Sequence, residues 1–209
     1  MPSIEFTPLW KVLQMPVRVA STLCHSLNVQ GFRNVPQTGG VLLLCNHQSH
    51  LDPPYVAVRM LRPCAFLAKS ELFKSRGFAW LIRSLGAFPV KQGKGDVGAM
   101  KQSIKLLAGG RAVLMFPEGS RTGHGGLQPL EPGMGLIVRR AKVPVVPVAI
   151  DGTFSAWPIS ASLPRSGRVR VRFGEPIVDL HESDARTIMD RVAREISELY
   201  QTIRFDQNP

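Results

Sequence analysis

Unbroken apolar runs restrict the fold of this chain more than any other feature of its sequence. The longest are VLLLC at 41–45, AFLAK at 65–69, AFPVK at 87–91, AVLMF at 112–116 and VPVVPVAI at 143–150. A strand with one wet face alternates apolar and polar residues, whereas a strand buried on both faces is apolar throughout. These runs therefore predict a sheet that is covered on both faces.

Helical patterns lie between the apolar runs. The clearest starts at Asp96, a predicted N-cap, and stops at Gly109 and Gly110, which favour the end of a helix. Another helix is expected after Asp52, with Pro53 at its first position, where the missing N–H costs nothing. The alternation of strands and helices is typical of an α/β fold.

The carboxyl-terminal part of the chain completes this fold prediction. RVRVRFG at 168–174 alternates basic and apolar residues, as a strand with one wet face would. A final helix is expected from about Ser183 to Arg204, with apolar residues along one side. A chain of 209 residues suits one domain with a substantial core. We therefore predict a single α/β domain with a mixed, largely parallel sheet flanked by helices.

Charge and cysteine usage limit the classes of partner and compartment. Lys and Arg total 26 against 15 Asp plus Glu, and the net charge of +11 indicates a phospholipid surface, a phosphorylated metabolite or nucleic acid as partner. Cys24, Cys45 and Cys64 lie in or beside apolar runs without a CxxC spacing, so we expect all three to be core thiols in a reducing compartment. We expect neither a secretory signal nor a membrane-spanning helix.

Residues 1–27 are predicted to form an amphipathic helical segment that precedes the main domain at 28–209. Lys11, Arg18 and His25 recur every seven residues and fall on one helical face, while most of the remaining circumference is apolar. Such a helix suits a bilayer interface. Packing of the helix on its own domain is the commoner alternative, and the pattern alone leaves both open.

Two polar clusters directly follow two of the predicted strands. NHQSHLD at 46–52 follows VLLLC, and PEGSRTGHGG at 117–126 follows AVLMF. In open α/β sheets, ligands bind beyond the carboxyl ends of the strands. The two clusters are therefore the first candidates for a functional site.

The first cluster holds a histidine and a carboxylate that a turn can bring together. The Asp52 carboxylate could reach one ring nitrogen of His47 and fix its tautomer, which would leave the other nitrogen free to take a proton from a hydroxyl. Asp52 could instead be the N-cap of the next helix, and one carboxylate could fill both roles.

A metal site is the alternative interpretation of the same cluster. His47, His50 and Asp52 are acceptable zinc ligands, and together they would support a metal-dependent hydrolase. The spacing departs from the HxHxDH pattern of metallo-hydrolase loops, because the two histidines are three residues apart and no histidine follows Asp52 directly. We expect no metal and no cofactor.

The second cluster has the composition of an anion site. Four glycines between 119 and 126 permit a tight backbone with exposed N–H groups, and Arg121 supplies a planar fork for phosphate oxygens. The segment is not a Walker loop, because GxxxxGK[ST] is absent. A glycine-rich surface turn, or a local ion pair between Glu118 and Arg121, is the alternative.

Taken together, these motifs resemble those of a known family. NHQSHLD resembles the NHxxxxD signature of the glycerophospholipid acyltransferases, and FPEGSRT is similar to the FPEGTRS-type signature of the lysophosphatidic acid acyltransferase branch. LGAFPVKQGKGD at 85–96 and VPVVPVAIDGT at 143–153 are similar to the second and fourth blocks of that branch. The resemblance covers roughly residues 28–180.

The resemblance implies an activity and roles for individual residues. The chain would transfer a fatty acyl group from acyl-CoA or acyl carrier protein directly to the free hydroxyl of a lysophospholipid, above all lysophosphatidic acid, without an acyl-enzyme. His47 would be the general base and Asp52 its orienting partner. Lys91 stands near a position where the family usually carries arginine, which binds anions with a fork that lysine lacks. The substrate-binding residues implied are Glu118, Gly119, Ser120, Arg121 and Lys91.

The family's substrates also bear on where the protein acts. Because a lysophospholipid resides in a membrane, the resemblance favours an interfacial role for 1–27 and a peripheral or monotopic position on the cytoplasmic side of a membrane, with 28–209 as the acyltransferase domain. The charge alone would also fit a nucleic-acid-binding protein. The aromatic residues do not interleave with the basic ones, however, so we expect no nucleic-acid partner.

Overall fold

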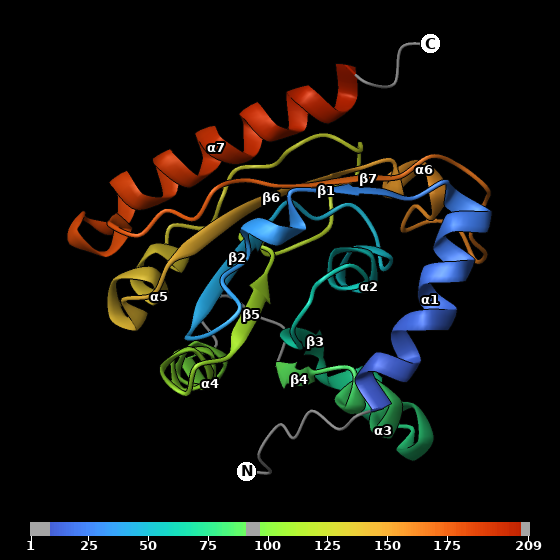
Figure 1. Ribbon diagram of the computed structural model, residues 1–209, viewed down its shortest axis with the longest axis horizontal. Coiled ribbons are helices and arrows are strands. Elements are labelled where there is room, and N and C mark those ends of the chain that lie inside the picture. Colours follow the sequence, from blue (N-terminus) through green and yellow to red (C-terminus); the bar gives the residue numbers. More distant parts are fainter. Residues whose placement is uncertain (1–8, 91–96, 206–209) are drawn as a thin grey trace.

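A β-sheet forms the centre of the protein in the computed structural model, which describes residues 9–90 and 97–205 (Figure 1). Within these residues the strands are β1 (Asn28–Gln30), β2 (Val41–Cys45), β3 (Cys64–Lys69), β4 (Ala87–Val90), β5 (Ala112–Met115), β6 (Val145–Asp151) and β7 (Arg170–Phe173). Their order in the sheet is β1-β7-β6-β2-β5-β3-β4. All neighbours run parallel except β6 and β7, which are antiparallel. The predicted mixed, largely parallel sheet is confirmed.

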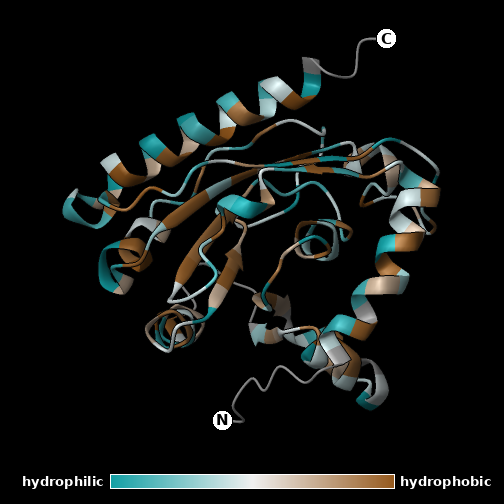
Figure 2. Ribbon diagram, in the orientation of Figure 1, coloured by the Kyte–Doolittle hydropathy of each residue, from teal (hydrophilic) through white to brown (hydrophobic). Residues whose placement is uncertain are grey.

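The apolar runs form the buried strands, as predicted. Strands β2, β5 and β6 are buried along their whole lengths, and Figure 2 shows them among the most hydrophobic parts of the ribbon. Strand β7 alternates half-buried and buried residues, in agreement with its alternating sequence. Strand β1 was not predicted, because three residues are too few to show a period.

Helices cover both faces of the sheet. The helices are α1 (Leu9–His25), α2 (Asp52–Ala57), α3 (Arg76–Ser84), α4 (Val97–Ala108), α5 (Met134–Ala141), α6 (Thr153–Ala156) and α7 (Ala185–Phe205). Helices α4, α5 and α7 contribute to the core on one face, where Leu42 and Leu44 point. On the opposite face, Leu43 and Cys45 pack with Tyr55 and other residues of α2, and Figure 1 shows α1 on that side.

The position of β2 places the two polar clusters side by side. Strand β2 lies between β5 and β6, with Leu44 opposite Met115 on one side and opposite Pro147 on the other. Because these strands are parallel, the segments that come after them leave the sheet at the same edge. The clusters at 46–52 and 117–126 therefore meet, together with the residues directly after β6.

Helix α1 attaches to the domain through polar residues and leaves an apolar side uncovered. Gln14 Nε2 donates to the carbonyl of Ala57 at 3.0 Å, and the rings of His25 and Tyr55 are bonded through Nδ1 and the hydroxyl at 2.6 Å. The helix thus packs on its own domain, but not through its apolar residues alone. Among the described side chains of α1, the large apolar ones that are exposed are Val12 (64%), Met15 (58%), Val19 (52%) and Leu23 (79%).

The prediction that all three cysteines belong to the core is wrong for Cys24. Cys45 and Cys64 are buried in strands, whereas Cys24, near the end of α1, is exposed. No helix in the described part of the chain is both long enough and apolar enough to cross a bilayer.

Candidate active site

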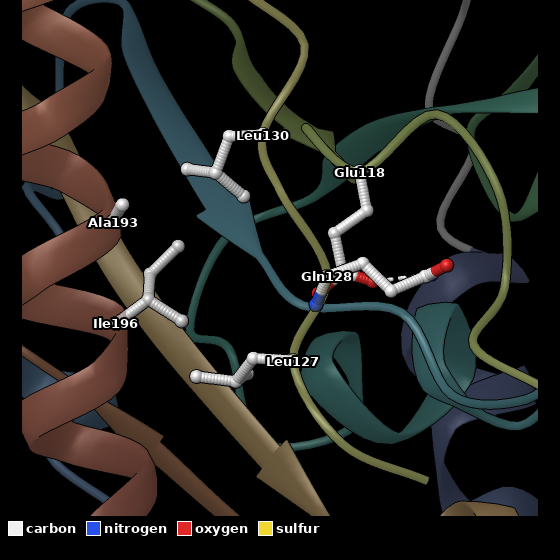
Figure 3. Close-up of a pocket in the computed structure, with 6 residues that line it drawn as sticks. All are labelled: Glu118, Leu127, Gln128, Leu130, Ala193 and Ile196. Carbon is white, nitrogen blue, oxygen red and sulfur yellow. Dashed lines mark hydrogen bonds between the residues drawn. The ribbon is translucent and has the colours of Figure 1, made fainter. Parts of the chain in front are cut away.

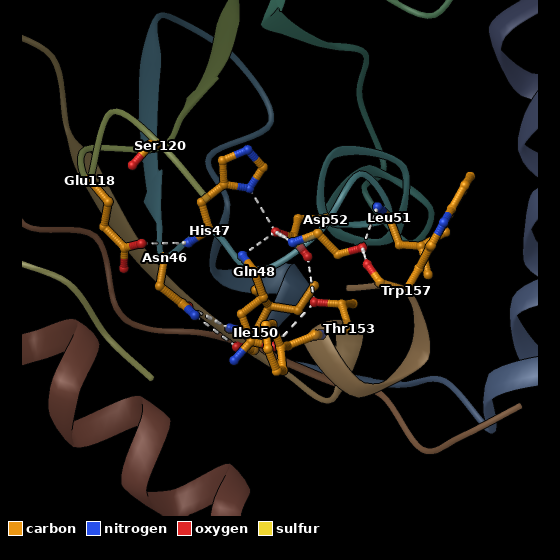
Figure 4. Close-up of polar contacts among 12 residues, drawn as sticks. Asn46, His47, Gln48, Leu51, Asp52, Glu118, Ser120, Ile150, Thr153 and Trp157 are labelled. Atoms are coloured by element: carbon orange, nitrogen blue, oxygen red, sulfur yellow. Dashed lines mark hydrogen bonds and ion pairs between the residues drawn. The ribbon is translucent and has the colours of Figure 1, made fainter. Parts of the chain in front are cut away.

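Asn46 fixes the point at which the chain leaves β2. Its side-chain Nδ2 donates to the carbonyl of Ile150 at 2.9 Å, and its Oδ1 accepts the N–H of Ile150 at 2.8 Å. The amide therefore continues the pairing of β2 with β6 after the backbone has turned away (Figure 4). His47, the next residue, projects beyond the edge of the sheet.

His47 and Asp52 form the hydrogen-bonded pair that the sequence predicted. His47 Nδ1 lies 2.7 Å from Asp52 Oδ2, the Asp52 side chain is fully buried, and that of His47 is 19% exposed. The same carboxylate oxygen accepts the N–H groups of Gln48 at 2.6 Å and Ser49 at 2.7 Å (Figure 4). This network assigns the ring proton to Nδ1, and Nε2 keeps a lone pair that can accept a proton.

The alternative that Asp52 caps the helix after it is wrong. Helix α2 begins at Asp52 itself, with Leu51 as its N-cap residue. The carboxylate turns back to the N–H groups of Gln48 and Ser49, which precede the helix. Pro53 accordingly occupies the second helical position, not the first.

Phe116 supports the His47 ring from one side. The two rings are stacked, with centroids 4.0 Å apart and planes at 19°. Phe116 directly follows β5, so the pairing of β2 with β5 brings the rings together. The imidazole is thus fixed at its edge by a carboxylate and on its face by a phenyl ring.

The second cluster is joined to the first by two contacts with the His47 backbone. The N–H of Thr122 donates to the carbonyl of His47 at 2.9 Å, and the N–H of His47 donates to Glu118 Oε2 at 3.2 Å. Glu118 also accepts from the Gln128 backbone N–H at 3.3 Å and from Gln128 Nε2 at 3.1 Å. All these partners of Glu118 are donors within the protein, so its carboxylate holds the two loops together.

Glu118 is buried and lines an apolar pocket. The pocket has a volume of about 150 Å³ and lies between α7 and the segment at 127–130 (Figure 3). Burial raises the pKa of Glu118, and the hydrogen bonds from Gln128 and His47 oppose that shift in part. The residues that line the pocket are Glu118, Leu127, Gln128, Leu130, Ala193 and Ile196.

Arg121 presents a buried N–H group that has no acceptor. Its side chain is half-buried, and Nη1 finds no hydrogen-bond partner among the described residues. Burial lowers the pKa of Arg121, while the negative charge of Asp52 acts in the opposite direction. The alternative of an ion pair with Glu118 is not observed in the described part of the chain. An unpaired guanidinium N–H in the loop bonded to His47 is suited to an anionic ligand.

The other predicted site residues differ in position. Gly119 has a φ of 71°, and exposed Ser120 offers its carbonyl to Gln128 Nε2 at 3.1 Å. Both lie in the loop between Glu118 and Arg121, which is bonded to His47 through its neighbours. Lys91 falls outside the described residues.

The metal-site alternative finds no support in this geometry. His50 is exposed, and its ring meets that of Trp157 edge-on with centroids 6.0 Å apart. Within residues 9–90 and 97–205, no group of three His, Cys, Asp or Glu side chains is arranged to hold a metal ion.

Cys45 is not available as a nucleophile, although it directly precedes the first cluster. Burial and the charges of Asp52 and Glu118 raise its pKa well above the ordinary value. Burial also raises the pKa of Cys64, to about 12. Both side chains are therefore thiols, and the nucleophilic form of cysteine is the thiolate.

Several residues of the site were missed in the sequence. Asn46 and Gln48 belong to the quoted motif, but the motif says nothing of their contacts. Thr153 lies 101 positions from Asp52, its hydrogen-bond partner, and Gln128 lies ten positions from Glu118. Of these residues outside the two clusters, only Thr153 belongs to a segment that resembles the family, the block VPVVPVAIDGT at 143–153, and that resemblance assigned no role to Thr153.

The fold and the paired motifs define a class of enzyme, and comparison with known proteins agrees. The Acyltransferase family model matches residues 26–151, which is more than half of the chain, and the protein belongs to this family. It is therefore an acyltransferase.

The proteins to which the chain is similar indicate its branch of the acyltransferase family. A 1-acyl-sn-glycerol-3-phosphate acyltransferase of Bacillus subtilis is 29% identical over 203 residues, which cover 96% of this chain and 98% of that protein. Its chloroplast counterpart in Brassica napus is 30% identical over 178 residues and 83% of this chain, and this chain spans about half (51%) of its length. The crystal structure of PlsC, the 1-acyl-sn-glycerophosphate acyltransferase of Thermotoga maritima, superposes with a TM-score of 0.77 at 28% identity, covering 91% of this chain and 79% of that one.

The raised pKa of Glu118 predicts a pH-dependent stability difference. Between the ordinary carboxyl pKa and the raised one, the folded protein binds a proton that the unfolded chain has released. The free energy of unfolding of the wild type, relative to Glu118→Gln, should therefore fall as pH rises through this window. Urea unfolding of both proteins across pH would measure this difference, with Glu198→Gln, at an exposed position of α7, as the control. A difference that stays flat or rises would contradict the burial argument.

Proposed function

We propose that this acyltransferase moves a fatty acyl group from a thioester, acyl-CoA or acyl carrier protein, to the free hydroxyl of lysophosphatidic acid and forms phosphatidic acid. The observation that carries the proposal is the His47–Asp52 pair, joined to a loop in which Arg121 holds an unpaired N–H. The names of the relatives supply the acceptor, a 1-acyl-sn-glycerol-3-phosphate. The chemistry of the two clusters fits that acceptor, which carries both a hydroxyl and a phosphate.

The reaction needs one base and no covalent intermediate with the enzyme. His47 Nε2 takes the proton of the acceptor hydroxyl as its oxygen attacks the thioester carbonyl carbon. The C–S bond breaks as the tetrahedral intermediate collapses, and the imidazolium returns the proton to the departing sulfur. Asp52 holds the ring and stabilises its positive charge during the step. No described hydroxyl or thiol donates to Nε2, so the substrate's own hydroxyl is the group to be deprotonated.

The glycine-containing loop is proposed to bind the acceptor's phosphate. Arg121 would supply charge-assisted hydrogen bonds through its unpaired N–H group, and the backbone of Gly119 and Ser120 lies in the same loop. Lys91 keeps its proposed role of adding charge to this site. Glu118 was expected to contact the substrate directly, and we now propose a different role for it. Its carboxylate accepts the N–H groups of His47 and Gln128, so it positions the phosphate-binding loop.

Loss of the base should abolish nearly all acyl transfer. We expect His47→Ala to lower kcat by about 10²- to 10⁴-fold, the usual contribution of general base catalysis. The rate of thiol release, with and without lysophosphatidic acid, measures kcat for acyl transfer. Comparing acyl-CoA with acyl carrier protein as the thioester shows which donor the enzyme uses. His181→Ala, in the turn before α7, is the matched control. Wild-type turnover in His47→Ala would refute the mechanism, and thiol release without an acceptor would indicate thioester hydrolysis instead.

Arg121→Ala should affect the acceptor more than the donor. Removing hydrogen bonds to a charged phosphate is expected to raise KM for lysophosphatidic acid by about tenfold or more, while KM for the donor changes by less than about twofold. Arg140→Ala, at the exposed end of α5, controls for the general loss of positive charge. Equal increases in both KM values would count against a phosphate-binding role.

Membrane attachment through α1 belongs to the same proposal. The acceptor is a lipid, and the exposed apolar side of α1 is suited to the interfacial layer of a bilayer, here its cytoplasmic leaflet. Exposed Lys11 and Arg18 would face anionic head groups. The polar contacts of Gln14 and His25 with the domain keep the apolar side turned outward.

Charges placed on this apolar side should weaken attachment. We expect the double variant Val19→Glu and Leu23→Glu to lower the fraction bound to phosphatidylglycerol-containing vesicles by about tenfold or more, because two apolar contacts with the bilayer would be replaced by charges. Val178→Glu is the matched control, since Val178 is 63% exposed and precedes α7 on the opposite face of the sheet. Co-sedimentation would measure binding. Unchanged sedimentation of the double variant would refute attachment through α1.

A further inference from the structure

The second oxygen of the Asp52 carboxylate is held by a residue from another part of the chain. Thr153 Oγ1 donates to Asp52 Oδ1 at 2.5 Å, while Asp52 Oδ2 faces His47. Thr153 and Asp52 are both fully buried. Figure 4 shows Thr153 on the side of Asp52 away from the imidazole. The carboxylate is thus fixed from both ends, by β2's loop and by the start of α6.

A sharp turn after β6 directs Thr153 to this position. Gly152 has a φ of 89°, and a Cβ atom at this residue would lie 2.0 Å from the carbonyl oxygen of Arg168. Only glycine fits such a turn without strain. The chain therefore reverses directly after the strand, and Thr153 points back toward the end of β2.

Gln48 fixes the backbone beside Thr153 through the N–H of Phe154. Gln48 Oε1 accepts the N–H of Phe154 at 3.3 Å and lies 3.2 Å from Thr153 Oγ1, while Gln48 Nε2 donates to the carbonyl of Gly125 at 2.6 Å. A hydroxyl has one proton to donate, and the shorter contact is with the charged oxygen of Asp52. Thr153 is therefore a donor to the carboxylate, with the Gln48 amide beside it.

A tyrosine of α7 anchors the same network. The Tyr200 hydroxyl lies 2.9 Å from the carbonyl of Gly125 and 3.0 Å from Asp151 Oδ1. These contacts connect the glycine loop, the end of β6 and Gln48. The network is buried, so water cannot replace a hydrogen bond that is lost there.

From this geometry we propose that Thr153 is a positioning residue for acyl transfer, one that acts on His47 through Asp52. Without the hydroxyl, Asp52 Oδ1 would be a buried charged oxygen without this donor, and the carboxylate would be held through Oδ2 alone. Its plane would then be fixed less tightly, and so would the orientation of the imidazole that keeps the ring proton on Nδ1. The inference rests on the proposed function, because it concerns the same proton transfer.

The test compares variants that differ by one hydroxyl. Thr153→Val has nearly the same shape without the hydroxyl, and we expect kcat to fall by about 10- to 100-fold, the size expected for one lost hydrogen bond to a charged group. KM for donor and acceptor should change by less than about twofold. Thr153→Ser keeps the hydroxyl and should retain kcat within about threefold. Thr202→Val, an exposed threonine of α7, is the matched control.

A double-mutant cycle distinguishes positioning from general structural support. If Thr153 acts through Asp52, Thr153→Val should have little further effect on kcat in an Asp52→Asn background, whereas independent structural damage would multiply the two losses. Circular dichroism and thermal unfolding check that each variant is folded. If Thr153→Val does not fold, Thr153→Ala removes the same hydroxyl with a smaller side chain and is used in the same cycle.

The outcomes separate the two proposals. A wild-type protein without acyl transfer would refute the proposed function itself. An active wild type with a Thr153→Val variant of unchanged kcat, or with multiplicative losses in the cycle, would overturn the role of Thr153 and leave the proposed function standing. Loss of kcat in Thr153→Val, restoration in Thr153→Ser and no further loss beyond Asp52→Asn would support it.

Discussion

Strand β2 pairs in parallel with β5 on one side and with β6 on the other, so three chain segments leave the sheet at one edge. Each segment carries one part of the candidate site: the loop after β2 holds the His47–Asp52 pair, the loop after β5 holds Arg121, and the turn after β6 holds Thr153. The backbone hydrogen bonds between the central strands bring these three segments together, and the helices that connect the strands do not change this arrangement. The chemistry therefore depends on the register of the three strands.

Asp52 and Glu118 are buried carboxylates at this edge of the sheet, and their surroundings give them different roles. Asp52 faces an imidazole ring, so its charge bears on the proton that the ring carries. Glu118 faces backbone N–H groups of two loops, beside an apolar pocket, so its charge bears on the path of the chain. The same functional group thus orients a side chain in one place and shapes a loop in the other.

Local patterns in the sequence were enough to predict the central strands and the hydrogen-bonded pair of His47 and Asp52. The apolar runs located the strands, and the spacing of His47 and Asp52 indicated the pair, since both signals lie within a few residues. Contacts between distant segments leave no such period: the Asn46 amide pairs with Ile150, and Thr153 reaches Asp52, each across about a hundred positions. The alternative of a capping role for Asp52 was wrong, because the carboxylate accepts N–H groups in the turn before its helix.

The stacking of His47 on Phe116 also restricts the direction from which a substrate can arrive. The lone pair of Nε2 lies in the plane of the imidazole, and the phenyl ring covers one face of that plane at a centroid distance of 4.0 Å. In the proposed reaction, a hydroxyl that donates to Nε2 would approach in the plane of the imidazole, alongside the phenyl ring. Phe116 would take no part in bond making, but it leaves only the edge and the other face of the imidazole open to a substrate.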